Sequence, residues 1–264
     1  MRFLSKCIAT IAVLLFLGAR FVCAQERKIS QMYELPAYSG TPYFYSAYTV
    51  QFNTKTNNPD WVAWHLNKER LGNIKVSRSG NKFTPDPNLG TLSPVSDDYT
   101  GSGYDRGHMC PANDCLQSGT ALFESFYMSN VCPQKSSLNR RSWLTLEDKC
   151  HTWILDNFYT SLYIVCGPVP DEIDKVIVTP LRHIVVPKRF FKAIIGEKRS
   201  GGYYGVAFIF DQKGHTEYMS IDDLELIVHR DLFSNMPSRI SKRAESRIPN
   251  RNDWPGIEVI GLNQ

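Results

Sequence analysis

Alternating apolar and polar positions predict two strands near the start of the chain. Residues 45–52 and 61–66 are rich in aromatic and β-branched side chains that partly alternate with polar ones. The turn-forming residues Asn57-Asn58-Pro59-Asp60 lie between them. Residues 126–130 predict a further strand, which Cys132-Pro133 is expected to end because proline lacks a backbone N–H.

A spacing of three to four residues predicts a helix in the middle of the chain. Its apolar face would consist of Trp143, Leu146, Cys150, Trp153 and Ile154. Three polar residues before it are candidates for its N-cap: Ser136, Ser137 and Asn139. Residues 221–229 predict a second helix.

The second half of the chain is richer in strand patterns. Residues 162–166 predict a short buried strand, and residues 190–195 and 203–210 predict two antiparallel strands joined by a Lys-Arg-Ser-Gly-Gly turn. Residues 77–103 are dominated by Gly, Pro, Asp, Asn and Ser, which predicts a long irregular surface loop. Strands in runs, without strict alternation with helices, favour an α+β fold around an antiparallel or mixed sheet.

Residues 1–24 have the features of a secretory signal peptide. Arg2 and Lys6 precede a short apolar run at residues 8–17, and Val22-Cys23-Ala24 offers a cleavage site. The apolar run is short for a membrane span, although a retained signal anchor is an alternative. We therefore expect a mature chain of residues 25–264, secreted or periplasmic and without stable membrane association. No repeat or linker divides it, which predicts a single domain.

Net charge gives little indication of a partner. The full chain has a formal net charge of +4, and removal of Arg2, Lys6 and Arg20 leaves +1. This near neutrality gives no overall electrostatic sign of nucleic-acid binding. One local basic run is interpreted as the solvated face of a helix. It consists of Arg239, Lys242, Arg243, Arg247 and Arg251.

The predicted mature chain has five of the seven cysteines, because Cys7 and Cys23 lie in the leader. Export to an oxidising compartment makes disulfides plausible, with at least one thiol left over. A local disulfide between Cys110 and Cys115 is one hypothesis. A zinc cluster of these two cysteines with His108 is the alternative, although the chain has no CxxC pair.

One ordered set of short motifs suggests catalysis. Gly103-Tyr104-Asp105-Arg106-Gly107-His108-Met109 is followed by Asn130-Val131-Cys132-Pro133-Gln134, by Leu138-Asn139, by Trp143 and by Leu146-Glu147. Singly, each has a structural explanation, such as a packed histidine, a capping asparagine or a solvated glutamate. Their order is more informative: a strand with His108, a second strand, a loop, and a helix with Asn139 and Glu147.

In this order the motifs resemble the signature of the DNA/RNA non-specific endonucleases. That family includes secreted bacterial sugar-non-specific nucleases and mitochondrial endonuclease G, and its signature is Asp-Arg-Gly-His, Asn-x-x-Pro-Gln, Leu-Asn, Trp and Leu-Glu. The resemblance covers residues 33–237. It implies a ββα-metal nuclease fold with a central, mainly antiparallel sheet flanked by helices. It also implies a metal-dependent endonuclease that hydrolyses both DNA and RNA.

The resemblance assigns roles to three residues at the centre of the motifs. His108 corresponds to the base that deprotonates the attacking water, in keeping with a pKa near neutrality for free histidine. Asn139 corresponds to the single direct protein ligand of Mg²⁺, with Mn²⁺ as an alternative ion. Glu147 corresponds to the residue that positions the waters around the ion.

The remaining motif residues are expected to support substrate or site. Arg106 corresponds to the arginine that stabilises charge on the phosphate. Gly107 is expected to let the backbone pass close to substrate or metal. Asn130 is expected to fix the loop that presents the site, and Asp105 to orient Arg106 or the same loop.

The family also has an upstream basic residue that contacts the transition state. In this sequence Arg78 is the favoured candidate, and Lys82, adjacent to Phe83, is the alternative.

Two other functions are compatible with the sequence. An inactive nucleic-acid-binding module on the same fold is one, and a phosphodiesterase acting on another substrate is the second. A two-metal nuclease is disfavoured because no cluster of Asp and Glu surrounds the motif. The sequence does not identify an inhibitor protein or an oligomeric state.

Overall fold

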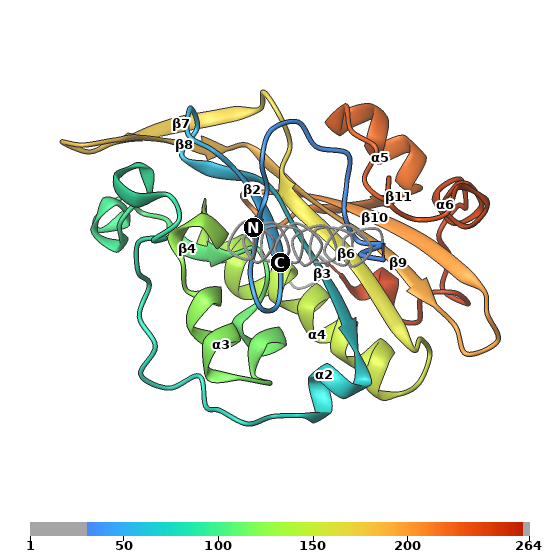
Figure 1. Ribbon diagram of the computed structural model, residues 1–264. Coiled ribbons are helices and arrows are strands. Elements are labelled where there is room, and N and C mark those ends of the chain that lie inside the picture. Colours follow the sequence, from blue (N-terminus) through green and yellow to red (C-terminus); the bar gives the residue numbers. More distant parts are fainter. Residues whose placement is uncertain (1–30, 261–264) are drawn as a thin grey trace, which may run out of the picture.

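A seven-stranded antiparallel sheet forms the centre of the computed structural model, which describes residues 31–260 (Figure 1). The predicted signal peptide lies outside these residues. Across the sheet the strands are β1 (Tyr43–Phe44), β2 (Thr49–Asn53), β3 (Asn58–Asn67), β6 (Ser161–Pro168), β9 (Arg189–Glu197), β10 (Tyr203–Asp211) and β11 (Thr216–Met219). The expected α+β fold with a mainly antiparallel sheet is confirmed.

Both faces of the sheet are buried, as the side-chain pattern of β3 illustrates. Val62 and Trp64 point into one apolar core, whereas Trp61 and Ala63 point into the other. Successive side chains of a strand point to opposite faces, so a strand with no polar alternation requires cover on both sides. The described part of the chain is therefore a sheet between two layers of helices and loops.

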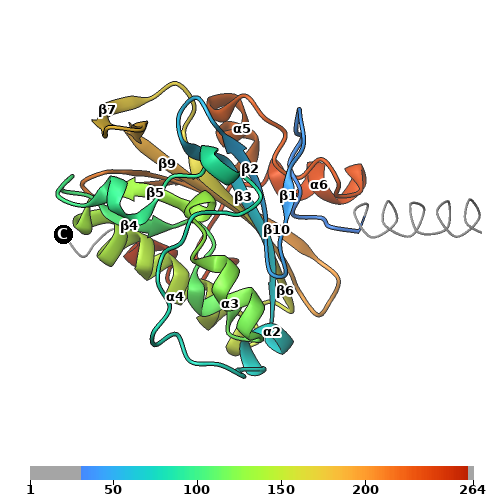
Figure 2. The same ribbon diagram turned by 60° about the vertical axis from the view of Figure 1, so that its left-hand side comes forward.

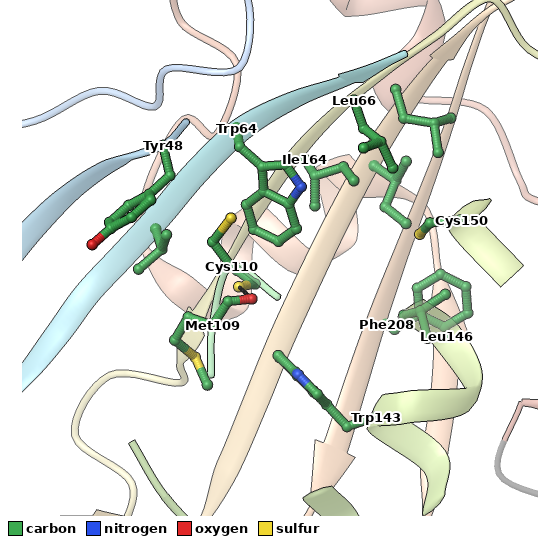
Figure 3. Close-up of a cluster of buried hydrophobic side chains, with 14 of the residues drawn as sticks. Tyr48, Trp64, Leu66, Met109, Cys110, Trp143, Leu146, Cys150, Ile164 and Phe208 are labelled. Carbon is green, nitrogen blue, oxygen red and sulfur yellow. Dashed lines mark hydrogen bonds between the residues drawn. The ribbon is translucent and has the colours of Figure 1, made fainter. Parts of the chain in front are cut away.

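Helices α2 (Lys68–Gly72), α3 (Gly119–Ser125) and α4 (Trp143–Leu155) lie on one side of the sheet, and α5 (Ile221–Val228) and α6 (Ser238–Glu245) lie on the other (Figures 1 and 2). Figure 3 shows the first core, where Trp143 and Leu146 of α4 face Trp64, Ile164 and Phe208 of the sheet. The helices predicted at residues 143–154 and 221–229 are thus confirmed. None of the helices in the described range is long and apolar enough to cross a bilayer.

The strand predicted at residues 126–130 is wrong. Residues Met128–Asn130 form a 3₁₀ turn, and the strand is β5 (Val131–Gln134), which includes Pro133. Pro133 is tolerated because β5 pairs with only one neighbour, β4 (Asp105–His108). The backbone at Phe126 and Met128 instead hydrogen-bonds to Thr84 of the long loop.

Two boundaries near the first strands also differ from expectation. The N–H of Tyr45 donates to the carbonyl of Tyr48 across a turn, so the first half of the predicted strand at residues 45–52 is the turn between β1 and β2, and only residues 49–52 lie in β2. The following turn ends at Asn57, which has a φ of 56°, and β3 begins at Asn58. A hairpin of β7 (Ile173–Val178) and β8 (His183–Pro187), not predicted, projects from the sheet.

The expected capping residues do not cap α4. The chain runs from a π-helical turn, Leu138–Ser142, directly into α4, and no side-chain cap hydrogen bond is present at either start. The Ser137 hydroxyl donates instead to the carbonyl of Gln212, at 3.0 Å. The amide of Asn139 has a different partner, described below.

The long loop predicted at residues 77–103 is present and is mostly irregular, with two short 3₁₀ turns at Gly90–Leu92 and Ser96–Tyr99. Asp86, fully buried, holds the loop in place by accepting hydrogen bonds from Tyr45 and Ser129. The loop is consequently tied to the body of the molecule between Arg78 and Arg106.

Candidate active site

Strand β4, the segment that follows it, the long loop, the π-helical turn and α4 enclose a cavity of about 380 Å³. Six of the eight predicted site residues line it: Arg78, Asp105, Arg106, His108, Asn139 and Glu147. Gly107 and Asn130 lie behind its wall. Residues far apart in the sequence meet here because the end of β4 lies against the helix that carries Glu147, where Trp143 Nε1 donates to the carbonyl of His108.

His108 lies between two phenyl rings at the end of β4. Its ring centroid is 4.8 Å from that of Phe83 and 5.0 Å from that of Phe126. The side chain is buried, and its Nε2 atom has no hydrogen-bond partner among the described residues. Burial, and secondarily the positive charge of Arg78, lowers the pKa of His108 to about 3. The imidazole is therefore neutral at neutral pH.

Asn139 is oriented by Asp105. Its amide nitrogen donates to Asp105 Oδ2 at 3.0 Å, and Arg140 donates to both oxygens of the same carboxylate at 2.8 Å. These bonds, that from Arg140 first, lower the pKa of Asp105. With its nitrogen committed to Asp105, Asn139 presents its amide oxygen as an acceptor. Of the two roles expected for Asp105, orientation of Arg106 is not supported by a hydrogen bond among the described residues, because the guanidinium of Arg106 bonds to Ser96 and Thr100 instead.

Glu147 faces the cavity from α4, and its side chain is only 14% exposed. Burial raises the pKa of Glu147 to about 7, although Lys192 opposes this shift. Lys192 Nζ is 4.0 Å from Glu147 Oε1 and 4.0 Å from the ring centroid of Trp143. Sequence analysis missed Lys192, whose only signal was a lysine between apolar residues of a buried strand.

Asn130 holds the segment that follows His108. Its side-chain oxygen accepts from the N–H of Cys110 at 2.8 Å, and its amide nitrogen donates to the carbonyls of Cys110 and Ser125 at 2.9 Å. Every polar atom of this buried side chain is thus paired, which fixes the backbone on the C-terminal side of the histidine.

The guanidinium of Arg106 is attached to the long loop. Its Nε and Nη2 donate to the carbonyl of Ser96, at 3.1 and 2.6 Å, and Nη2 also donates to Thr100 Oγ1. Its Nη1 takes part in none of these bonds, so one edge of the guanidinium is left for a ligand in the cavity.

The structure gives a different reason for a glycine at position 107 from the one expected. A Cβ at this position would lie 2.1 Å from Oε1 of Gln134, on the paired strand β5. The glycine therefore admits the buried side chain of Gln134, and no close approach of substrate or metal is needed to explain it.

Arg78, and not Lys82, lies at the cavity. Arg78 is one of the lining residues, and its charge acts on both His108 and Glu147. Lys82 is exposed and does not line this cavity.

The expected disulfide between Cys110 and Cys115 is not formed. Their sulfur atoms are 3.8 Å apart, and all five cysteines of the described residues are free. The zinc alternative is also not supported, because His108, Cys110 and Cys115 do not bring ligand atoms together. Both thiols lie beside the buried guanidinium of Arg70, at 3.9 and 3.7 Å from Nη2.

Comparison with known proteins agrees with this geometry. Residues 30–239 match the family model of the DNA/RNA non-specific endonucleases. The chain belongs to this family. It is 31% identical over 220 residues to a nuclease of Nostoc sp., with 77% of each chain covered. It is 38% identical over 162 residues to the mitochondrial Nuclease 1 of Schizosaccharomyces pombe, covering 57% of this chain and 50% of that relative.

The fold is also that of a solved nuclease of the family. The crystal structure of an EndoG/EndoGI complex matches with a TM-score of 0.70 at 25% identity, covering 80% of this chain and 94% of that one. That structure concerns the mechanism of EndoG inhibition. The match to the S. pombe nuclease spans half of its length, whereas the match to the Nostoc nuclease spans 77% of that relative.

The donor set of the cavity suits a hard divalent cation such as Mg²⁺. The Asn139 oxygen is left free by the bond from its nitrogen to Asp105, and the Glu147 carboxylate faces the same cavity, with Lys192 as its ion-pair partner. Mg²⁺ prefers oxygen ligands and keeps several waters, so a sparse protein site is sufficient.

Proposed function

We propose that this protein is a sugar-non-specific endonuclease that hydrolyses phosphodiester bonds of DNA and RNA with the help of Mg²⁺ or Mn²⁺. The observation that carries the proposal is the convergence of His108, Asn139 and Glu147 on one cavity. Membership of the DNA/RNA non-specific endonuclease family supports it.

His108 acts as the general base in this proposal. Its neutral imidazole can accept a proton, and Nδ1 is the acceptor, because Nε2 is sealed from the cavity and from solvent. A base with a pKa near 3 is weak in the empty cavity. A phosphate diester bound beside it brings negative charge, which raises the histidine pKa and strengthens the base where it is needed.

Arg78 and Arg106 supply positive charge to the phosphate. Both line the cavity, and the attachment of Arg106 to Ser96 holds its guanidinium in one orientation before substrate arrives. Donors fixed in advance stabilise developing negative charge without reorganisation cost during the reaction.

Asn139 would hold the cation through its amide oxygen, with Asp105 and Arg140 fixing that oxygen in place. When bound, the ion stabilises negative charge on the phosphate and on the leaving oxygen. Glu147 would orient solvent in the cavity, and the positive charge of Lys192 opposes the rise of its pKa and so favours the charged carboxylate.

We also propose that the protein is exported to the periplasm or the medium. The leader-like pattern of residues 1–24 supports this proposal, because it combines basic residues, an apolar run and small residues at a cleavage position.

Replacement of the base tests the mechanism. His108→Ala should leave a folded protein whose nuclease rate on plasmid DNA with Mg²⁺ falls by about 10²–10⁴-fold, the usual contribution of a general base. His183→Ala, at an exposed position on β8, is the matched control and should cut at the wild-type rate. Circular dichroism checks folding, and a reaction with chelator gives the metal-free background.

Two results would contradict the proposal. A folded His108→Ala variant that cuts at a near-normal rate removes His108 as the base. Wild-type protein that binds DNA but leaves it intact with Mg²⁺ or Mn²⁺ would favour the inactive module instead.

A further inference from the structure

A cluster of acids lies on the face of the sheet opposite to the active-site cavity. Asp222 and Glu225 are on α5, and Glu245 is the last residue of α6, and oxygens of the three carboxylates lie within 4.8 Å of one another. The two helices contact each other above β10 (Figures 1 and 2). Their core belongs to the second apolar layer, so the cluster is separated from α4 and His108 by the sheet.

Glu245 is the acid of this cluster whose carboxylate is buried with one oxygen unpaired. Its side chain is 7% exposed, and its Oε1 atom is sealed with no hydrogen-bond partner among the described residues. Buried carboxylate oxygens are normally paired, because an unpaired one loses its hydration without compensation. The same carboxyl group belongs to the cluster, since one of its oxygens lies within 4.8 Å of oxygens of Asp222 and Glu225.

Charge in this region lacks compensation. Burial first, and then the negative charges of Glu225, Asp231 and Asp222, raise the pKa of the Glu245 carboxyl to about 8, while a side-chain hydrogen bond with Ser241 opposes the shift. Within residues 31–260, no basic side chain forms an ion pair with any of the three cluster acids. Glu245 also ends α6, where the helix dipole is unfavourable for a negative charge and favourable for a cation.

We propose that Asp222, Glu225 and Glu245 form a second cation site that binds Ca²⁺ and fastens α6 to α5. Three carboxylates supply hard oxygen ligands with flexible geometry, which Ca²⁺ prefers, whereas Mg²⁺ rarely uses such protein cages. Asp222 is exposed, so solvent and the ion have access to the cluster.

A bound ion would hold the two C-terminal helices, α5 and α6, together. α6 packs tightly on β10, where a Cβ at Gly205 would lie 2.3 Å from the carbonyl oxygen of Ala244. An ion held by Glu245 fixes the residue next to this contact. The ion therefore stabilises the seat of α6 on the sheet and takes no part in phosphodiester cleavage.

Thermal unfolding with CaCl₂ as the probe tests the site. The melting temperature of wild type should rise by about 5–10 °C when Ca²⁺ exceeds its Kd a hundredfold. Asn139→Ala should show the same rise, which separates this site from the active site. Glu245→Gln and Asp222→Asn should lose the rise while retaining Mg²⁺-dependent nuclease activity. Glu217→Gln, an exposed acid on β11, is the matched control and should respond like wild type.

The melting temperature measured in chelator shows whether Glu245 is a ligand of the ion or only a residue that supports the fold. Glu245→Gln removes a repelled carboxylate, so its melting temperature in chelator should equal or exceed that of wild type. The proposal is overturned if wild type shows no rise at millimolar Ca²⁺, or if Asp222→Asn keeps the full rise. Asp222 is exposed, so that variant decides the matter even if Glu245→Gln fails to fold.

Discussion

At the residue scale, the position of His108 combines a chemical role with a cost in stability. The two phenyl rings that pack against the imidazole exclude water and leave Nε2 without a partner. The same packing makes the charged form unfavourable and keeps the ring neutral. Burial therefore keeps the imidazole neutral, as a proton acceptor must be. The same burial makes the protonated imidazole unfavourable while no substrate is bound.

This cost predicts a pH-dependent difference between wild type and His108→Ala. The unfolded histidine has a pKa of 6.5 and the folded one about 3, so between these values the unfolded state binds more protons. Stability of wild type must then fall as the pH drops below 6.5. His108 accounts for a loss of about 2 kcal/mol in the free energy of unfolding at pH 5.

Denaturant unfolding at pH 7.5 and pH 5 measures this difference. The free energy of wild type should fall by about 2 kcal/mol more than that of His108→Ala, because other groups titrate in both proteins. His183→Ala should follow the wild-type curve. Equal losses in wild type and His108→Ala would show that the buried ring is not held neutral.

Site residues were predictable from the sequence where they belong to a motif. They were less predictable where their role depends on tertiary packing. The motifs led to His108, Asn139 and Glu147, which the structure brings to one cavity. Lys192 was missed because its partners, Glu147 and Trp143, are on a helix far away in the sequence. No local pattern reports a contact that forms only when strand and helix meet.

At the scale of elements, the β4–β5 hairpin depends on the fit of Gly107 against Gln134. Gly107→Ala places a methyl group 2.1 Å from Gln134 Oε1 and 2.5 Å from its Cδ. The variant should lose about 1–3 kcal/mol in the free energy of unfolding, the usual cost of overpacking. Adding Gln134→Ala should restore stability, so that the double variant is more stable than Gly107→Ala alone.

The matched control for this element is Gly119→Ala, on α3, where an added Cβ meets nothing within 4 Å. It should be as stable as wild type or slightly more stable, because alanine favours helix. A Gly107→Ala protein with wild-type stability would mean that the Gln134 side chain moves away without cost.

The link between β4 and α4 predicts a metal-dependence defect in Asp105→Asn. The neutral residue loses its two bonds from Arg140 as an ion pair and no longer fixes the amide of Asn139. The Mg²⁺ concentration for half-maximal activity should rise about 10–100-fold, as for other residues that orient a metal ligand. The rate at saturating Mg²⁺ should change little.

Titration of nuclease activity with MgCl₂ measures this shift. Asp148→Asn, an exposed acid on the same helix as Glu147, should leave the titration unchanged. An Asp105→Asn titration that coincides with wild type would show that Asn139 holds its orientation without the carboxylate.

Elements with strong periodicity were predictable, whereas irregular ones were not. The strands at 162–166, 190–195 and 203–210 and the helix at 143–154 are observed where the pattern places them. Residues 126–130 were assigned wrongly because their apolar side chains pack against the long loop, where Thr84 pairs with their backbone. Strand β7 is almost entirely exposed, so no alternation of buried residues indicated it.

At the scale of the whole molecule, the sheet separates two layers with different tasks. The layer with α4 carries the cavity, and the layer with α5 and α6 carries the second core. The sequence predicted this fold class, but it did not predict the state of the cysteines. Cys110 and Cys115 are near each other as expected, yet each is packed as a buried thiol beside Arg70.

The whole cavity also predicts which nucleic acids are cut. Ribonucleases that use the 2′-hydroxyl of the substrate as nucleophile cannot cleave DNA. In the mechanism proposed above the nucleophile is a water activated by His108, Arg78 and Arg106 contact the phosphate, and Asn139 holds the metal ion; all four residues line the cavity. None of these roles requires the 2′-hydroxyl, by which a protein distinguishes RNA from DNA, and phosphate contacts carry no direct base information. DNA and RNA should therefore be cut at rates within about tenfold, with weak sequence preference.

Cleavage of a ribo- and a deoxyribo-oligonucleotide of one sequence, followed by end-group analysis, measures both parts of this prediction. A water nucleophile that displaces the 3′ oxygen leaves a 5′-phosphate and a 3′-hydroxyl on either substrate, as the family resemblance also implies. His183→Ala, the exposed control, should give the same ratio of DNA to RNA rates as wild type. A strict requirement for RNA, or 2′,3′-cyclic phosphate ends, would show that the substrate supplies its own nucleophile and that His108 does not activate water.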